Sequence, residues 1–274
     1  MKTIAVILTV FNRKKKTLDC LDGLFIQSIP SDIHIDVFMV DDGSTDGTSE
    51  AVAGRFPEVN VIRGSGDLFW NRGMHLAWTV ALKKQEFDYY LWLNDDTYLK
   101  KDALKKLLKT SYDFKDKSII VGTTCALDDH NKITYGGRSR KKGLLIPKQS
   151  PQECDYFNGN IVLIPFYVHK IVGLNDPIFR HALGDFDYGL RAKAEGVKMY
   201  IAPEILGKCD LHHELATWCN PKKSFLKRWK AFRSPLGNNP EEFYKFEKRH
   251  KGFGIALFHY ITNHVRLVAP YLWN

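Results

Sequence analysis

Short apolar runs rich in Val and Ile alternate with segments of helical periodicity, and this alternation constrains the fold of the chain more than any other feature. Such alternation is typical of βαβ units and a mainly parallel sheet. We expect strands at Ile4–Val10, Ile35–Val40, Val59–Ile62, Tyr89–Leu93, Ile119–Gly122 and Ile161–Ile164. We expect helices at residues 15–28, 48–56, 71–84, 101–110 and 185–195, and a hairpin or loop within residues 128–148. The predicted class is α/β.

Positive charge gathers at the C-terminal end of the chain. The net charge is +9, and residues 220–274 hold eleven Lys and Arg against three acids, so that this segment alone carries +8. We therefore divide the chain into a domain at residues 1–219 and a basic helical tail at residues 220–274. This asymmetry indicates that the tail meets an acidic surface, either anionic lipid or nucleic acid.

The cysteines and the N-terminal segment indicate the cellular compartment of the protein. Five cysteines are spread along the chain without a C-x-x-C pair, which is typical of reduced thiols in the cytosol. The apolar run at residues 4–10 lacks a small-residue cleavage site and is followed by basic residues, which favours a first strand over a signal peptide.

Two adjacent carboxylates follow the strand predicted at residues 89–93, in the segment Asn94–Thr97. Open parallel sheets bind ligands beyond the carboxyl ends of their strands. Polar clusters follow four of the predicted strands, at Thr9–Asn12, Asp41–Thr48, Gly64–Asp67 and Asn94–Thr97. Asp95 and Asp96 would repel each other unless a cation lay between them. Mg²⁺ or Mn²⁺, held by one or two carboxylates and by substrate phosphates, suits such a place. The alternative is a helix cap, but Asp102 lies closer to the start of the next helix.

The segment Asp41–Thr48 matches the first half of a calcium-binding loop. Ala53 stands where that loop requires a bidentate Glu, so we exclude calcium binding there. We expect Asp46 to cap the following helix, which leaves Asp42 free to face a ligand.

A second acidic pair stands at the start of the helix predicted at residues 185–195. Asp187 and Arg191 have the i, i+4 spacing of a structural ion pair. Asp185 has no such partner, which makes it the better candidate for a general base. His212 or His213 could add an imidazole to a metal that carboxylates already hold, whereas the spacing of Cys209, His212 and Cys219 does not favour an independent zinc site.

Taken together, these segments resemble the family 2 glycosyltransferases, the inverting GT-A enzymes that use nucleotide-sugars. The resemblance implies a Rossmann-like, mainly parallel mixed sheet flanked by helices, with the basic helical tail as a C-terminal extension. The resemblance covers roughly residues 3–215. It is carried by Ile7–Arg13, Val40–Thr48, Leu93–Thr97, Phe157–Asn160, Gly184–Asp187 with Arg191, and His212. Within that family, Gly66–Asn71 and Tyr90–Asp96 resemble rhamnosyltransferases of bacterial surface-polysaccharide pathways.

The resemblance implies a role for each matching residue. It implies that the nucleotide-sugar is bound by Thr9, Phe11, Asn12, Asp42, Asn71 and Asp95. It implies a divalent metal, Mg²⁺ or Mn²⁺, on Asp96 and His212, with His213 as the second choice for the imidazole. Asp185 would be the catalytic base, and Asn158, Asn160 and Asp187 would lie on the acceptor side. The sequence departs from the family at Gly184, where Glu is common, and at Asn94, which replaces the first acid of a D-x-D motif.

The chemistry that the resemblance implies agrees with these residue types. The donor leaves as a nucleoside diphosphate, whose charge a divalent ion neutralises. Asp185 would take the proton from an acceptor hydroxyl as it attacks the anomeric carbon, so that configuration inverts in one displacement.

The tail has the pattern of a membrane-surface helix. Residues 221–233 place Phe225, Trp229 and Phe232 on one helical face among six cations. A second apolar stripe with helical spacing follows at residues 253–271. The alternative is that both helices pack on the preceding domain. We expect the tail to hold the enzyme at the inner face of the cytoplasmic membrane, where a lipid-linked glycan acceptor would be presented.

Two other functions remain as alternatives. A non-catalytic basic protein could bind nucleic acid through its tail, but the sequence has no RRM, KH, helix-turn-helix or zinc-finger signature, so we expect no nucleic-acid partner. A sugar nucleotidyltransferase shares the α/β plan, but its glycine-rich triphosphate loop is missing.

Overall fold

The computed structural model describes residues 1–211 and 216–272. Within them a main sheet has the strand order β10-β13-β6-β12-β4-β1-β2-β3, with β5 and β7 paired at its margin. Its strands are β1 (Lys2–Val10), β2 (Ile33–Asp41), β3 (Asn60–Arg63), β4 (Tyr89–Leu93), β5 (Tyr98–Leu99), β6 (Ile119–Cys125), β7 (Ile133–Tyr135), β10 (Gln152–Glu153), β12 (Ile161–Pro165) and β13 (Met199–Lys208). A small second sheet contains β8 (Gly137–Ser139), β9 (Gly143–Leu144) and β11 (Tyr156–Phe157).

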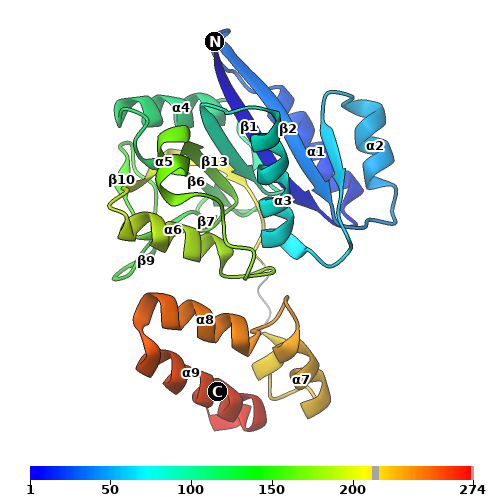
Figure 1. Ribbon diagram of the computed structural model, residues 1–274, viewed down its shortest axis with the longest axis vertical. Coiled ribbons are helices and arrows are strands. Elements are labelled where there is room, and N and C mark those ends of the chain that lie inside the picture. The colour runs from blue at the N-terminus through cyan, green and yellow to red at the C-terminus, as the bar shows by residue number, and fades with distance from the viewer. Residues whose placement is uncertain (212–215, 273–274) are drawn as a thin grey trace.

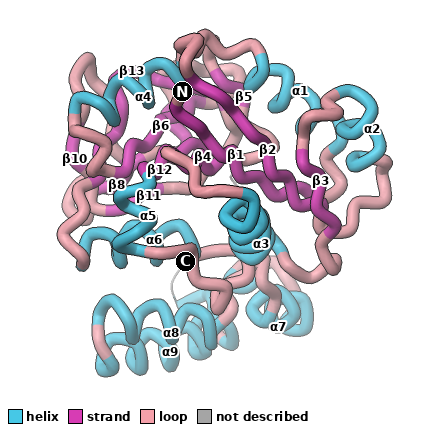
Figure 2. The backbone as a smooth tube through the Cα atoms, turned by 45° about the horizontal axis from the view of Figure 1, so that its top comes forward, coloured by secondary structure: helices cyan, strands magenta, loops and turns pink. Residues whose placement is uncertain are grey.

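Helices cover both faces of the main sheet, with α1, α2 and α4 on one face and α3, α5 and α6 on the other (Figure 2). Their bounds are α1 (Lys14–Phe25), α2 (Thr48–Arg55), α3 (Phe69–Lys84), α4 (Ala103–Asp113), α5 (Phe166–Val172) and α6 (Gly184–Ala194). Successive side chains of β1 alternate between the two layers: Ile4 and Val6 pack on the first and Ala5 and Ile7 on the second. Because both faces are covered, this strand is apolar throughout.

The predicted α/β class is confirmed, and each predicted strand and helix of the sheet has its counterpart. The hairpin expected within residues 128–148 corresponds to β7, β8 and β9. The sheet is mixed, as the resemblance implies, since β12 runs antiparallel to β4 and β6. One strand, β13, differs from expectation because the sequence analysis does not predict it. Strand β13 contains Pro203 and a register shift between Ile201 and Ile205, which conceal its strand pattern.

The parallel strands β1, β2 and β4 end at the same edge of the sheet. Their ends carry the segments after Val10, Asp41 and Leu93, which the sequence had marked as polar clusters. The sheet therefore brings these three segments together on one side of the α/β domain (Figure 1).

The C-terminal module, residues 216–272, lies beside this edge of the α/β domain (Figure 1). It contains η1 (Thr217–Cys219), α7 (Phe225–Arg233), α8 (Pro240–Lys251), α9 (Phe253–Val268) and η2 (Pro270–Leu272). Helix α8 joins the two parts through ion pairs, since Glu242 pairs with Arg180, and Arg249 pairs with Asp176 and Asp187.

The prediction that residues 221–233 form a helix with an exposed aromatic face is correct only in part. Phe225 and Trp229 are exposed, but Phe232 is fully buried against Trp218 and Leu267. Arg228, one of the six cations, is also buried, and it donates to the carbonyl oxygens of Leu267 and Lys223. Phe232 and Arg228 therefore stabilise the module and do not reach its surface. Among the described residues, no helix has the length and apolar character needed to cross a bilayer.

Candidate active site

Two adjoining cavities lie at the carboxyl edge of the sheet. The first cavity has a volume of about 390 Å³ and the second about 410 Å³. They share Arg13, Trp70, Asp95 and His181 as lining residues. Both volumes fall in the range of small-molecule sites, so the pair suits an elongated ligand.

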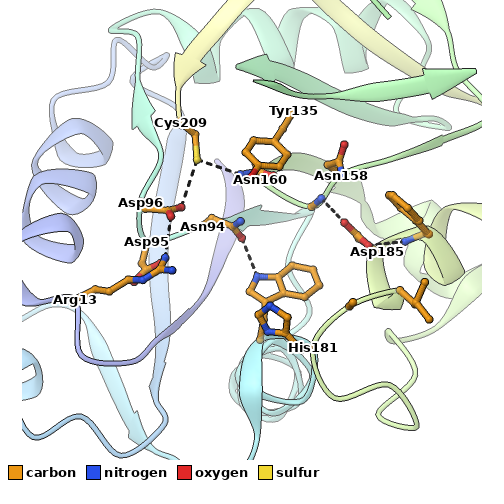
Figure 3. Close-up of a pocket in the computed structure, with 15 residues that line it drawn as sticks. Arg13, Asn94, Asp95, Asp96, Tyr135, Asn158, Asn160, His181, Asp185 and Cys209 are labelled. Atoms are coloured by element: carbon orange, nitrogen blue, oxygen red, sulfur yellow. Dashed lines mark hydrogen bonds and ion pairs between the residues drawn. The ribbon is translucent and has the colours of Figure 1, made fainter. Parts of the chain in front are cut away.

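Asp95 and Asp96 face the first cavity from one side and Asp185 faces it from the other (Figure 3). Asp95 and Asp96 follow β4, and Asp185 lies in the first turn of α6. Asn158 and Asn160, from the segment before β12, also line this cavity. The structure thus brings five of the predicted site residues to one place.

The guanidinium of Arg13 lies between the two adjacent carboxylates. Its Nη1 is 3.1 Å from Oδ1 of Asp95 and 2.8 Å from Oδ2 of Asp96. Asp95 is only 5% exposed, and burial raises its pKa to about 7, with Arg13 opposing the rise. A cation therefore does separate this pair of acids, as electrostatics requires, and it is a side chain of the protein itself.

The same two carboxylates fit a divalent cation. Oδ1 of Asp95 and Oδ2 of Asp96 converge on a single positively charged atom, and Oδ2 of Asp95 is buried without a hydrogen-bond partner. Among the described residues, no set of three His, Cys, Asp or Glu side chains is arranged to hold a metal ion. The two carboxylates would therefore need phosphate oxygens of a substrate or a further side chain. His212 and His213, predicted for that role, lie outside the described residues.

Asp185 is held by two backbone hydrogen bonds. Gly159 N donates to its Oδ2 over 2.9 Å, and Phe186 N donates to its Oδ1 over 2.8 Å. Burial raises the pKa of Asp185 to about 6, although these two hydrogen bonds oppose the rise. A carboxylate with such a pKa at the wall of a cavity is suited to accept a proton near neutral pH.

Asn71 does not line either cavity, in contrast to its predicted role in donor binding. It is fully buried, and its amide donates to the carbonyl oxygens of Asp176 and Phe179. A Cβ on Gly184 would lie 2.0 Å from Oδ1 of Asn71, so only glycine fits there. Asn71 therefore fixes the segment before α6 and packs closely on Gly184, next to Asp185. This packing leaves no room at position 184 for the Glu that is common in the family that the sequence resembles.

Asp187 is also fully buried and lines neither cavity, so its predicted place on the acceptor side does not hold. The predicted ion pair with Arg191 is confirmed, at 2.9 Å. Arg249 and His250 from α8 bind its other oxygen. These hydrogen bonds keep the pKa of Asp187 below its usual value although burial alone would raise it. Asp187 joins α6 to the C-terminal module.

Four of the residues predicted for the nucleotide line the second cavity: Thr9, Phe11, Asp42 and Asp95. The Asp42 carboxylate accepts hydrogen bonds from the backbone of Gly66, Leu68 and Phe69 and so shapes the loop before α3.

Asn12 is exposed and lines neither cavity. Its Oδ1 accepts a hydrogen bond from Thr45 N, and its backbone N–H donates to Ser44. Asn12 therefore ties the segment after β1 to the segment after β2, at the rim of the site.

Several lining residues had no predicted role: Arg13, Trp70, His181, Cys209 and Leu236. Nε1 of Trp70 donates to Oδ1 of Asn94, so the amide that replaces the first acid of a D-x-D motif holds an aromatic wall. Cys209 lies 3.5 Å from Oδ1 of Asp96. Arg13 follows directly after the Thr9–Asn12 cluster and ends the segment Ile7–Arg13, which carries part of the resemblance, and these were the signals that could have identified it.

Because Arg13 contacts both acids, it should compete with a divalent metal ion for Asp95 and Asp96. In Arg13→Gln, we expect the metal-free protein to lose about 1 kcal/mol of stability, because the partly exposed ion pairs are removed. We expect Mn²⁺ to raise the melting temperature more in the variant than in the wild type, because it no longer competes with a guanidinium. Thermal unfolding with and without Mn²⁺ measures both effects.

Arg55→Gln is the matched control, since Arg55 pairs with Asp22 at the surface of the α1 and α2 layer. Its Mn²⁺ response should equal that of the wild type. If Mn²⁺ raised the melting temperature equally in all three proteins, the metal and the Arg13 guanidinium would not bind at the same site.

Comparison with solved structures identifies the fold. TarS of S. aureus, residues 1–349 with UDP, aligns with a TM-score of 0.59 and 16% identity over 90% of this chain and 64% of that chain. The mannosyltransferase PcManGT from Pyrobaculum calidifontis, with GDP-Man and Mn²⁺, aligns with a TM-score of 0.58 and 17% identity over 99% of this chain and 75% of that chain. The chain thus spans less than two thirds of the TarS fragment. The mixed, mostly parallel sheet flanked by helices is the GT-A fold, with a C-terminal helical extension.

A match to a family model identifies the family of the chain. Residues 5–171 match the model of glycosyl transferase family 2. The chain belongs to this family. No curated protein matches the chain.

Proposed function

We propose that the protein transfers a sugar from a nucleotide-diphosphate donor to a hydroxyl group of a glycan acceptor, with inversion at the anomeric carbon. The observation that supports this most strongly is the first cavity, where Asp95 and Asp96 stand opposite Asp185. One side carries the acids that can hold a cation beside a diphosphate. The other carries a carboxylate whose pKa of about 6 suits proton removal.

The two cavities divide the donor between them. The second cavity, lined by Thr9, Phe11 and Asp42, would take the nucleoside, with the exposed ring of Phe11 against the base. The sugar would enter the first cavity past Asp95, which lines both. A divalent ion, Mg²⁺ or Mn²⁺, on Asp95 and Asp96 would neutralise charge on the departing diphosphate. His212 remains its proposed further ligand.

The reaction is a single displacement. The acceptor oxygen attacks the anomeric carbon while Asp185 takes the hydroxyl proton, and the bond from that carbon to the diphosphate oxygen breaks. The backbone N–H groups of Gly159 and Phe186 orient the Asp185 carboxylate. Asn158 and Asn160 line the same cavity and would contact the acceptor. The arrangement needs no covalent enzyme intermediate.

We further propose a lipid-linked acceptor, as in the synthesis of bacterial surface polysaccharide, and a rhamnose-like donor sugar. Two observations support this proposal. The sequences of Gly66–Asn71 and Tyr90–Asp96 resemble those of rhamnosyltransferases, and the C-terminal module is basic. Residues 221–233, with Phe225 and Trp229 exposed, would contact anionic lipid at the inner face of the cytoplasmic membrane. The family match favours this function over a sugar nucleotidyltransferase or a nucleic-acid-binding protein.

A donor panel tests the proposal. UDP-, dTDP- and GDP-sugars are added to the protein with Mn²⁺, with Mg²⁺ or with EDTA, and thermal unfolding is followed. We expect one nucleotide series to raise the melting temperature by several degrees, and only when the cation is present, because diphosphate and carboxylates share the ion. Stabilisation by none of the donors, or equal stabilisation in EDTA, would contradict the proposal.

A further inference from the structure

Helix α9 exposes an apolar face that no described residue covers. Five side chains on this face are each at least 40% exposed: Leu257, Phe258, Ile261, Val265 and Val268. Their spacing of three or four residues puts them on one side of the helix. Tyr271 and Leu272 in η2 continue the exposed apolar surface. A contiguous apolar surface of this kind on a water-soluble fold marks a place of binding.

The opposite side of α9 is occupied. Ala256 and Leu267 are buried, Tyr260 packs on Tyr244 of α8, and His259 hydrogen-bonds to Glu247 of α8. Helix α8 lies between α9 and the α/β domain (Figure 1). The apolar face of α9 is therefore the outermost layer of the C-terminal module, on the side away from the α/β domain.

The charges around this face indicate what covers it. Residues 252–272 contain no Asp or Glu. Exposed lysines stand on and before the neighbouring helix α7: Lys222, Lys223, Lys227 and Lys230. A second copy of the chain would bring two segments of charge +8 together, which is repulsive. Anionic phospholipid offers hydrocarbon for the apolar side chains and negative charge for the lysines.

We propose that the outer face of α9 inserts into the interfacial region of an anionic membrane and is the principal apolar anchor of the protein. This inference rests on the proposed membrane association. It assigns the apolar contact with the membrane to α9, so that α7 contributes mainly positive charge. Helix α9 lies along the bilayer, with α8 stacked above it. The carboxyl edge of the sheet, which faces the module, is thereby held close to the lipid surface where a lipid-linked acceptor is located.

Helix α8 also connects this anchor to the active site. Its Arg249 and His250 bind Asp187, two residues from Asp185 on α6. Leu236, in the segment between α7 and α8, lines the second cavity. Deleting the module would remove the partners of the fully buried Asp187, so point variants at exposed positions are the better test.

The experiment uses the full chain and flotation with vesicles of phosphatidylcholine alone or of phosphatidylcholine with phosphatidylglycerol. Phe258→Ser with Ile261→Ser alters the outer face of α9. Tyr112→Ser with Ile146→Ser is the matched control, since these side chains are even more exposed than Phe258 and Ile261 but lie on the α/β domain. A third variant, Lys227→Ala with Lys230→Ala, removes charge from α7.

We expect the α9 variant to bind the anionic vesicles at least about tenfold more weakly than the wild type, because less apolar surface is buried in the bilayer. The control should bind as the wild type does. The lysine variant should lose about tenfold or more on anionic vesicles, and added salt should remove its difference from the wild type.

Two results would overturn the inference. One is unchanged vesicle binding by the α9 variant. The other is a wild-type dimer in sedimentation without lipid that the α9 variant converts to monomer, which would make α9 a contact between copies. Stabilisation by UDP- or GDP-sugars is measured on the same variants and should be unaltered, so that a failed anchor is distinguished from a failed transferase.

Discussion

Asp185→Asn is expected to lower the rate of sugar transfer by about 10²- to 10⁴-fold while the donor still binds. The amide is isosteric with the carboxylate but cannot take the proton of the acceptor hydroxyl. One oxygen remains to accept a hydrogen bond from Gly159 N or Phe186 N, so the cavity wall is preserved. Initial rates with the donor chosen from the panel, together with the donor dissociation constant, measure both effects.

The pH profile gives a second readout for the same residue. Burial raises the pKa of Asp185 to about 6, and the base acts only when it is deprotonated. At saturating Mn²⁺, which would keep Asp95 deprotonated, the wild-type rate should therefore be constant above this pH and should fall about tenfold per unit below it. The residual rate of Asp185→Asn should lack this dependence. Asp113→Asn, an exposed carboxylate on α4, is the control and should behave as the wild type. A variant Asp185→Asn with the wild-type rate would contradict the role of Asp185.

Asp96→Ala is expected to reduce transfer by about 10²- to 10³-fold, the loss typical of removing one electrostatic group from an active site. Its effect should differ from that of Asp185→Asn in one respect. Because Asp96 would share the cation with the diphosphate, the variant should also bind the donor more weakly and should require more Mn²⁺. Mn²⁺ titrations of the initial rate and of donor affinity measure this difference.

The fold should tolerate Asp96→Ala, because Arg13 keeps its contact with Asp95. Asp129→Ala, an exposed acid in the segment before β7, serves as the control. Equal Mn²⁺ requirements in the wild type and in Asp96→Ala would exclude Asp96 as a metal ligand. The same loss of transfer without any change in donor binding would assign Asp96 to the acceptor side.

Local patterns were sufficient to predict most of the sheet and the place of the site. Apolar runs predicted β1, β2, β3, β4 and β6. Of these strands, β1, β4 and β6 are buried on both faces and read as almost continuously apolar. The polar segments after Val10, Asp41 and Leu93 predicted one edge, because parallel strands end together. The direction of β12 was not predictable, since periodicity does not distinguish parallel from antiparallel pairing.

The residues whose placement was mispredicted have partners far away in the chain. Asn71 looked like a ligand-binding residue, but its amide binds carbonyl oxygens of residues more than one hundred positions later. Asp187 showed one local partner, Arg191, while its other partners come from α8. A polar side chain that serves a distant loop or helix cannot be distinguished from a ligand-binding one by its neighbours in sequence.

The tail shows the same limit of local sequence patterns, which do not reveal the partner of a side chain. Its apolar positions predicted helices correctly, but one helical stripe can face either a partner helix or a membrane. In the structure both occur, since Phe232 and Leu267 fill the core of the module while Phe258 and Ile261 stay exposed. The packing of α7, η1 and α9 against one another separated the two sets.

Anomalous diffraction from Mn²⁺ in crystals grown with the donor nucleotide tests the account most directly. We predict a manganese peak within bonding distance of Asp96, at the place where Arg13 lies in the metal-free protein, with the nucleoside in the cavity beside Thr9 and Asp42. A manganese peak away from Asp95 and Asp96, or a nucleotide whose diphosphate does not approach the cavity that contains Asp185, would contradict it.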